Sequence, residues 1–334
     1  MTSPQRSDSP AVSIVIPAFR ASADIPDALA SVFRQTFTDF EAIVVNDGSP
    51  DTPELEQALR PYEGRVRYMV QPNRGAAAAR NTGVWAAQGR YIAFLDADDL
   101  WTPEFLRRQV AFLDAHPEST LVYADALITG DTPLARRRFA QTAPSQGPAT
   151  LLNLIEQRCN IMLSTVVVRR DALLEAGLFD ESVRRGHDAD LWFRLAWRGA
   201  MLDYQPQVLA ERRVRSDGLS GDRLSELTRA VAVMTRFGEL YELSGKERTA
   251  LTVRLEHLQK QIEVEEAKRR LIEGNFAAAR TRLALYRPSS LRASLKVRAA
   301  LIGLRIAPRL LRRVYLSLRG APASSGAQHH RATA

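Results

Sequence analysis

Three aspartates follow a short apolar run in YIAFLDADDLWTP, residues 91–103. The run predicts a buried strand, and Asp96, Asp98 and Asp99 stand at its end. Residues two apart on an extended chain point the same way, so Asp96 and Asp98 can face one ligand while Asp99 points elsewhere. Close carboxylates repel unless a cation lies between them. Since Mg²⁺ or Mn²⁺ completes its shell with water and substrate phosphates, the pattern favours a diphosphate ligand.

A second candidate is Asp47 in VVNDGSPD, at the end of another predicted buried strand. Gly48 permits a sharp turn directly after it. A buried carboxylate there can accept hydrogen bonds from a nucleobase N–H or from ribose hydroxyls. Two simpler interpretations stay open: Asp47 belongs to an ordinary strand-to-helix turn, and DADD at 96–99 caps the next helix.

A third stretch, NRGAAAARNTG, begins a predicted helix at Gly75. Its small residues would let a ligand pack close, and its N-terminus favours negative charge. Arg74 and Arg80 are therefore candidate ligand contacts. The chain contains neither G-x-G-x-x-G nor G-x-x-x-x-G-K-[ST], which argues against a dinucleotide enzyme and a P-loop NTPase.

The elements that would position these residues alternate between strands and helices. The candidate strands occupy residues 12–17, 41–46, 65–70, 91–96 and 120–127. Strands this hydrophobic, separated by helical patterns, predict an α/β fold with a mostly parallel sheet flanked by helices. Polar residues at 17–20, 46–49 and 96–99 should then open on one edge of the sheet, where ligands of such folds bind.

The second half of the chain changes character. Residues 129–149 are rich in Pro, Gly and polar side chains and predict a mobile loop. The next expected elements are a helix at about 149–158, a β-branched run at 164–170 and a helix at 188–199. From residue 222 onward the pattern is helical. We expect a flexible leader (1–10), an α/β domain (11–221), an α-helical C-terminal extension (222–319) and a flexible tail (320–334).

Composition narrows the class of protein. A chain of 334 residues with 45% hydrophobic content can bury a sizeable core. The single cysteine, Cys159, excludes an internal disulfide and fits a reducing compartment; a small buried hydrophobe is its usual role, and a nucleophile the rarer one. No apolar run reaches the roughly 18 residues that span a bilayer. We expect a cytoplasmic protein.

Six segments, in this order, resemble the inverting family 2 glycosyltransferases. They are VSIVIPAFR, IVVNDGS, NRGAAAARNTG, YIAFLDADDLW, LFDESVRRGHDADLWFRL and RRVRSDGLS. The resemblance covers residues 12 to 221 or so. It implies a GT-A fold and transfer of a sugar from a nucleotide-diphosphate donor, a UDP-sugar above all, to a saccharide or lipid-linked acceptor. Synthesis of a surface polysaccharide or glycolipid is the expected setting.

The resemblance also implies roles for the donor-side residues. Pro17 and Phe19 would line the nucleoside site, with the aromatic ring packed on the base. Asp47 would bind the uracil-type ring, and Arg80 would contact the nucleobase or phosphate region.

The resemblance assigns two further donor contacts, and the sequence departs from the family pattern at two positions. Asp96 would touch the ribose, and Asp98 would coordinate the Mg²⁺ or Mn²⁺ that bridges the diphosphate. Arg215 stands where the family often has His; arginine cannot ligate a metal, but its fork suits a diphosphate. Arg20 replaces a common Asn.

The family's catalytic base lies in an acidic pair before a helix, usually Glu-Asp, and here the pair is His187-Asp188. By resemblance, Asp188 would deprotonate the acceptor hydroxyl. Asp190 is a rival that we expect to start and orient the helix, and an acidic first helical turn is the alternative for the whole group. His187 could tune Asp188, contact the acceptor, or be structural.

Basic residues concentrate near the end of a chain whose net charge is +8. Twelve of the 46 Lys and Arg residues follow Glu273, and none of the 38 acidic residues does. Helical spacing over 309–319 places apolar and basic residues on opposite faces: Leu310, Leu311, Val314, Tyr315 and Leu318 against Arg309, Arg312, Arg313 and Arg319. Such a helix could lie on an anionic membrane or pack on protein. No motif supports nucleic-acid binding.

Two rival functions remain to be weighed. A sugar-nucleotide pyrophosphorylase would need a Gly-rich, Arg-bearing phosphate loop after the first strand, which PAFRASADIP lacks. A catalytically silent scaffold would keep the fold and bind a membrane or partner through its helical tail. Asp47, Asp98 and Asp188 argue against the scaffold.

Overall fold

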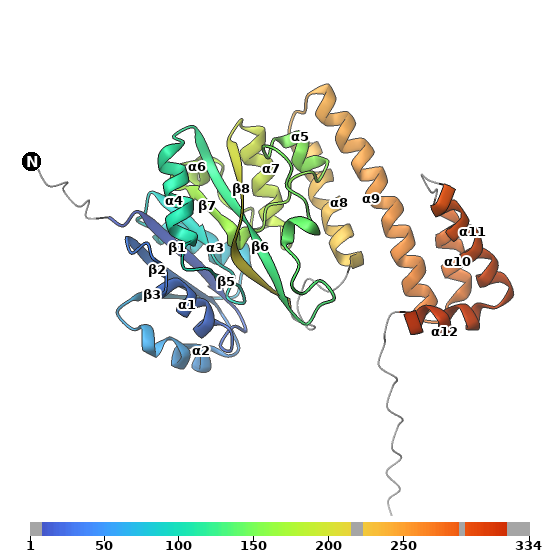
Figure 1. The fold of residues 1–334 in the computed structure, drawn as a ribbon, viewed down its shortest axis with the longest axis horizontal. Helices are drawn as coiled ribbons and strands as arrows, with labels where there is room; N and C mark the ends of the chain where they lie inside the picture. The colour runs from blue at the N-terminus through green and yellow to red at the C-terminus, as the bar shows by residue number, and fades with distance from the viewer. Residues whose placement is uncertain (1–8, 215–222, 287–290, 319–334) are drawn as a thin grey trace, which may run out of the picture. The chain divides into compact units, whose positions relative to one another are not determined.

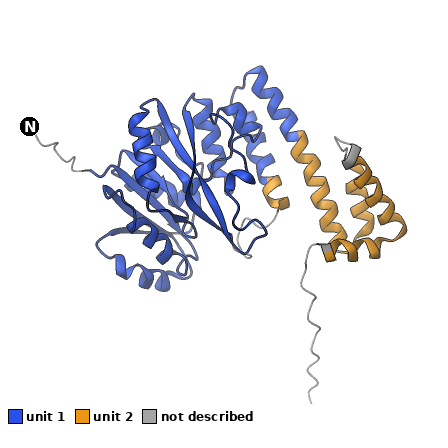
Figure 2. Cartoon of the chain, viewed as in Figure 1, with its two compact units in different colours: residues 1–222, 229–255 blue, residues 223–228, 256–334 orange. Residues whose placement is uncertain are grey.

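The computed structural model describes residues 9–214, 223–286 and 291–318. These residues form two compact units (Figure 2). The first contains 9–214 and 229–255, and the second contains 223–228, 256–286 and 291–318. Helices α8 (Arg223–Leu240) and α9 (Gly245–Ile272) each pass from one unit into the other.

An eight-stranded sheet lies at the centre of the first unit (Figure 1). Its order is β3-β2-β1-β4-β7-β6-β8-β5. The strands are β1 (Val12–Ala18), β2 (Phe40–Asp47), β3 (Val66–Gln71), β4 (Tyr91–Phe94), β5 (Leu100–Trp101), β6 (Ser119–Gly130), β7 (Val166–Arg169) and β8 (Met201–Val214).

The expected mostly parallel α/β fold is confirmed. Parallel pairing joins β3, β2, β1 and β4, and also joins β6 to β8. Strand β7 pairs antiparallel with β4 and β6, and β5 pairs antiparallel with β8. Two strands thus run against the other six. The sequence did not predict β8, because Pro206 and polar neighbours break its apolar alternation, and its pairing with β6 shifts register around Asp125.

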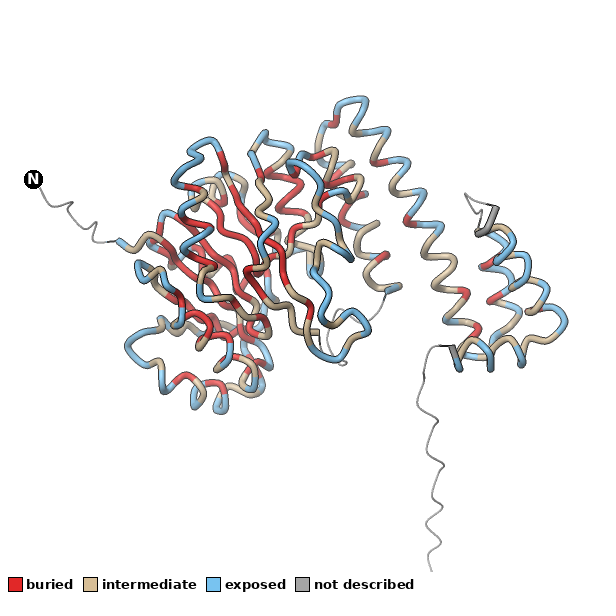
Figure 3. Tube along the Cα trace, viewed as in Figure 1, coloured by how far each residue is buried: buried red, intermediate tan, exposed pale blue. Residues whose placement is uncertain are grey.

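Helices cover the sheet, and the strands at its centre are buried (Figure 3). The helices and 3₁₀ turns of this part are α1 (Ile25–Phe33), α2 (Thr52–Leu59), η1 (Arg60–Tyr62), α3 (Ala76–Ala86), α4 (Phe105–Ala115), η2 (Phe139–Gln141), α5 (Leu151–Ile155), η3 (Leu163–Thr165), α6 (Arg170–Glu175) and α7 (His187–Trp197). A Cβ at Gly83 of α3 would lie 2.4 Å from Val15 Cγ1. Glycine there lets α3 pack closely on β1.

Three strands end together at the edge where the sequence places its polar residues. Ala18 at the end of β1 pairs with Asn46 near the end of β2. Val15 of β1 pairs with Phe94, the last residue of β4. Because all three strands are parallel, the segments that follow them open on one edge, as expected.

The segment after β6 folds back on the strand that precedes it. Arg138 Nε donates to the buried Asp125 carboxylate at 2.7 Å, and Ala140 N donates to the other oxygen at 2.9 Å. Ile128 N donates to Arg137 O at 2.8 Å. The loop expected at 129–149 is therefore tied to β6 through an ion pair.

The second unit confirms the expected helical extension. It contains the end of α9 with α10 (Phe276–Leu285), α11 (Leu291–Ile306) and α12 (Pro308–Leu318). Its small core is formed by Ala267, Leu271, Ala279, Leu283 and Leu304. No described helix has the length and apolar content to cross a membrane.

Helix α12 divides the apolar face that helical spacing predicts over residues 309–319. Leu311 and Tyr315 pack against the core of the second unit, whereas Leu310 and Val314 are exposed. The face is divided because α12 crosses the end of a small core and can turn only part of its apolar stripe inward. The side chain of Leu318 and all of Arg319 lie outside the described residues.

Candidate active site

Arg80 on α3 connects the end of β4 to the first residue of α7. Its side chain is only 6% exposed, and Nη2 donates to the Asp96 carboxylate. Nη1 lies 2.5 Å from Nε2 of His187. Because a guanidinium has only donors, this imidazole nitrogen must be the acceptor. Burial first, and then the charge of Arg80, lowers the pKa of His187, so the ring is neutral at neutral pH.

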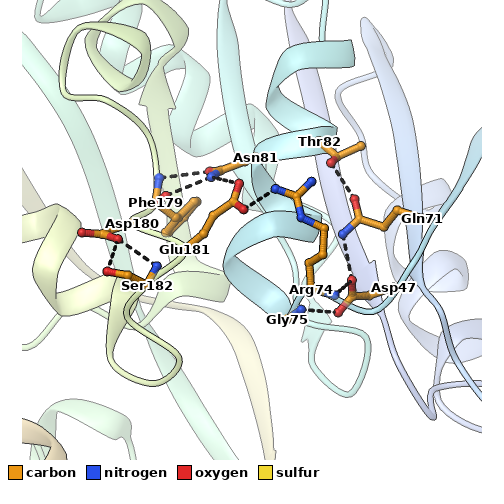
Figure 4. Close-up of polar contacts among 10 residues, drawn as sticks. All are labelled: Asp47, Gln71, Arg74, Gly75, Asn81, Thr82, Phe179, Asp180, Glu181 and Ser182. Carbon is orange, nitrogen blue, oxygen red and sulfur yellow. Dashed lines mark hydrogen bonds and ion pairs between the residues drawn. The ribbon is translucent and has the colours of Figure 1, made fainter.

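Phe179 packs beside this contact and helps to place α7. Its ring lies edge-on to His187, with centroids 5.6 Å apart, and edge-on to Phe94 at 5.2 Å. Asn81, next to Arg80 on α3, holds the Phe179 backbone with hydrogen bonds of 2.9 and 3.0 Å (Figure 4). The segment before α7 is thus anchored to α3.

Asp98 and Asp99 occupy different environments. Asp99 is buried and accepts from Ser164 Oγ at 2.6 Å and from Arg213 N at 3.1 Å. Asp98 accepts from Arg213 Nε at 2.7 Å only through its backbone carbonyl. Its carboxylate accepts no hydrogen bond from another residue in the described ranges. Burial, and then the charge of Asp96, raises the pKa of Asp98, so a cation at this carboxylate would be stabilising.

The carboxylate of Asp98 fits a hard divalent cation as a single protein ligand. Within the described residues, no group of three or more His, Cys, Asp or Glu side chains could enclose a metal. Mg²⁺ and Mn²⁺ ordinarily need only one or two carboxylates when water and phosphate oxygens supply the rest. Asp96, paired with Arg80, is less available than Asp98.

The carboxylate of Asp47 accepts hydrogen bonds from other residues of the protein. One oxygen accepts from Gln71 Nε2 at 2.7 Å and from Arg74 N at 2.9 Å, and the other accepts from Gly75 N at 2.8 Å (Figure 4). The residue is 3% exposed. The carboxylate therefore stabilises the start of α3, where the helix dipole favours an anion. Asp47 thus has a structural role at a helix other than α2, the one that follows it in the chain, and its contact with a ligand stays a prediction.

Two close approaches join the loops at this edge. Gly48 has φ +62°, and a Cβ there would lie 2.6 Å from Asn73 N, so only glycine fits. Arg74 forms an ion pair of 2.5 Å with Glu181, which also accepts from Asn81 Nδ2 at 3.2 Å (Figure 4). The turn before α3 and the segment before α7 are linked.

Phe19 and Pro17 lie at the end of β1. Pro17 is half-buried within the strand, whereas Phe19 is 46% exposed. The Arg20 guanidinium lies 5.6 Å from the centroid of that ring. Arg20 N donates to Ser49 Oγ at 2.6 Å, which ties this segment to the loop after Asp47.

The two acids of α7 differ as strongly as those after β4. Asp190 is buried and pairs with Arg194 at 2.8 Å, and Arg194 also donates to the carbonyl oxygens of Ala176 and Leu178. Asp190 therefore orients the helix. Asp188 is half-buried and forms no hydrogen bond or ion pair with any residue in the described part of the chain. Arg215 lies outside the described residues.

Four further polar residues of the site were not predicted. Arg213 precedes Arg215 by two positions in the segment RRVRSDGLS, so the sequence signal for Arg213 was the same segment. Asn81 lies inside NRGAAAARNTG and was passed over. Ser164 and Glu181 carry no signal, because a lone Ser or Glu is common at the start of a strand or in a loop.

The sequence of this chain is similar to those of known glycosyltransferases. The family model described as Glycosyl transferase family 2 matches residues 13–174. The putative teichuronic acid biosynthesis glycosyltransferase TuaG of Bacillus subtilis is 30% identical over 217 residues, 64% of this chain and 83% of TuaG. The uncharacterized glycosyltransferase RP339 of Rickettsia prowazekii is 27% identical over 226 residues, 66% of this chain and 69% of the relative.

Solved structures share the fold. S. aureus TarS 1–349 in complex with UDP aligns with a TM-score of 0.57 at 20% identity, covering 96% of this chain and 93% of that one. The mannosyltransferase PcManGT of Pyrobaculum calidifontis, in complex with GDP-Man and Mn²⁺, aligns with a TM-score of 0.61 at 18% identity, covering 93% and 85%.

Proposed function

The chain belongs to the family 2 glycosyltransferases and has the expected GT-A fold, and from this premise we propose that it is an inverting, metal-dependent enzyme. It transfers a sugar from a nucleotide-diphosphate donor to a hydroxyl of a saccharide or lipid-linked acceptor.

The observation that carries the proposal is how the acids at the carboxyl edge are partnered. Asp96 pairs with Arg80, Asp99 accepts from Ser164, and Asp190 pairs with Arg194. Among the acids after β4 and at the start of α7, Asp98 and Asp188 alone keep carboxylates that bond to no other described residue. An enzyme of this class needs one free carboxylate for a metal and one for a base.

The donor is proposed to lie along the ends of β1, β2 and β4. Phe19 would pack on the base and Pro17 would line the same site. Asp96 would approach the ribose beside Arg80. Asp47 would bind the base through the remaining hydrogen-bond acceptor positions of its carboxylate. Arg215 would contact the diphosphate. UDP bound by TarS and GDP-Man bound by PcManGT support a nucleotide-sugar donor.

A metal would be held by Asp98 together with phosphate oxygens, as Mg²⁺ or Mn²⁺. The Mn²⁺ of the PcManGT complex supports this choice. When bound, such an ion supplies positive charge that stabilises the departing nucleoside diphosphate.

Asp188 would act on the acceptor. Its carboxylate takes the proton of the attacking hydroxyl, whose oxygen forms a bond to the anomeric carbon. The bond from that carbon to the β-phosphate oxygen breaks on the opposite face, and its electron pair leaves with the nucleoside diphosphate. Attack opposite to the leaving group inverts the anomeric configuration.

The cellular setting is proposed from the relatives. The similarity to TuaG, a putative teichuronic acid biosynthesis glycosyltransferase, supports a surface polymer as the product. A cytoplasmic site on the inner face of the membrane follows from the expected donor. The membrane contact expected at 309–319 stays a proposal.

Calorimetry with a panel of nucleotide diphosphates and their sugars, with and without Mn²⁺, tests the donor site. We expect one nucleotide to bind tightly only with Mn²⁺, and Asp98→Ala to lose that binding. Asp171→Ala, an exposed acid in the first turn of α6, is the matched control and should bind as the wild type does.

Two outcomes would count against the proposal. If the folded protein binds none of the nucleotides, the donor site is wrong and the silent scaffold is favoured. Donor hydrolysis followed by NMR tests the stereochemistry, because an inverting enzyme first releases the sugar with the opposite anomeric configuration. Release with retained configuration would exclude inversion.

A further inference from the structure

Large aliphatic side chains face outward on two consecutive helices of the second unit. Helices α11 and α12 are separated by a single residue, and we name residues 302–314 the α11–α12 corner. The exposed fractions are 58% for Ile302, 76% for Ile306, 61% for Leu310 and 46% for Val314. Neighbouring exposed apolar side chains on a folded surface mark an interaction site.

The inward side of the corner is already packed. Leu304 is buried in the core of the second unit, and Leu311 packs against the same core. A Cβ at Gly303 would meet the Leu311 side chain at 3.4 Å, so the two helices are in close contact there. The outward aliphatic residues are therefore additional to the residues that pack these helices on their own core.

The charge of the corner has one sign. Residues 291–318 contain seven Lys or Arg residues and no Asp or Glu. Arg305, Arg309 and Arg313 are exposed at the corner. None of the three forms an ion pair within the described ranges of the chain. Cations and aliphatic side chains thus alternate on the same exposed turns.

We propose that the α11–α12 corner binds the surface of an anionic lipid bilayer. Its aliphatic side chains enter the boundary between headgroups and acyl chains, and its arginines contact lipid phosphates. A nucleic acid would match the arginines, but Ile302, Ile306 and Leu310 offer its bases no aromatic ring to stack on. A second copy would bring two cationic corners together. Sugar transfer is not required for this contact.

Vesicle co-sedimentation of the full chain tests the proposal. The probe is vesicles of phosphatidylglycerol and phosphatidylcholine in equal parts, compared with pure phosphatidylcholine. We expect partitioning to the anionic vesicles that weakens with salt. The double variant Ile302→Ser/Ile306→Ser should weaken it about tenfold or more. Arg305→Gln/Arg309→Gln should weaken it about fivefold for each cation removed.

Matched variants in the first unit test whether vesicle binding depends on the corner or on exposed aliphatic and basic residues anywhere on the protein. Leu240 and Val253 of the first unit are 62% and 61% exposed, so Leu240→Ser/Val253→Ser removes similar aliphatic surface. Arg34→Gln/Arg108→Gln removes two exposed cations of the first unit, one directly after α1 and one in α4. Both controls should bind as the wild type does. Near-UV circular dichroism of each variant checks that the fold is kept.

Three results would overturn the proposal. One is equal partitioning to anionic and neutral vesicles. Another is wild-type partitioning by both corner variants. The third is concentration-dependent dimerisation that the corner variants abolish without changing vesicle binding, which would assign the surface to a second copy of the chain.

Discussion

Nη1 of Arg80 lies 2.5 Å from Nε2 of His187, although the two residues are 107 positions apart. Arg80 also donates to Asp96. One buried guanidinium therefore joins the end of β4, on the proposed donor side, to the residue before the proposed base Asp188. The substitution of His187 for the more usual acid thus has a structural partner in this chain.

The Arg80 contact predicts different outcomes for two changes at His187. Alanine removes the acceptor and leaves a buried guanidinium donor unpaired, so the start of α7 can shift; small displacements of a reacting group cost between about tenfold and 100-fold in rate. We expect kcat for donor turnover to fall within this range in His187→Ala, with a smaller change in KM. His187→Gln keeps an acceptor oxygen and should stay within about threefold of the wild type. Equal rates for wild type and His187→Ala would show that the contact has no role.

The same residue predicts a pH dependence of stability. Because the pKa of His187 is lowered from its ordinary value of 6.5, the unfolded chain binds more protons than the folded chain between the folded pKa and 6.5. The free energy of unfolding should therefore fall as pH drops below 6.5 and should be insensitive to this group above it. Urea unfolding of wild type and His187→Gln at pH 7.5 and pH 5 should show a steeper loss for the wild type. Parallel losses would contradict the assignment.

The two acids of α7 predict opposite phenotypes. Asp190→Ala leaves Arg194 buried without its carboxylate, and breaking a buried pair in this way costs about 3 to 5 kcal/mol. Asp188→Ala removes a carboxylate that bonds to no described residue, so stability should change by less than about 0.5 kcal/mol while transfer is lost. Thermal unfolding and donor turnover of both variants check this. A destabilised Asp188→Ala would mean that this residue is structural.

The hydrogen bonds of Asp47 predict that its removal destabilises the protein even when no nucleotide is bound. Asp47→Ala leaves Arg74 N and Gly75 N without their acceptor at the start of α3. We expect a loss of about 2 to 3 kcal/mol in the free energy of unfolding. Asp39→Ala, an exposed acid just before β2, is the control and should change little. An unchanged stability of Asp47→Ala would show that the carboxylate is available for a ligand.

Some parts of the fold could be predicted and others could not, for identifiable reasons. Strands β1, β2, β3, β4, β6 and β7 were expected because runs of apolar and β-branched residues mark them in the sequence. Strand β8 was missed because Pro206 and its polar neighbours hide the pattern, and long-range pairing with β6 stabilises it instead. The division of the α12 face was missed because helical spacing shows that a face is apolar but not how much of it a neighbouring core covers.

Hydrophobic periodicity and chain order are local properties, and they are enough to show which acids stand at strand ends and in what order. Because they follow strands that were expected to be parallel, Asp47, Asp96 and Asp98 were predicted to lie on one edge of the sheet. Which carboxylates stay without a hydrogen-bond partner among the described residues could not be predicted from the sequence. That outcome depends on Ser164, Arg194 and Arg213, and hydrogen-bond partners from separate elements are brought together only by folding.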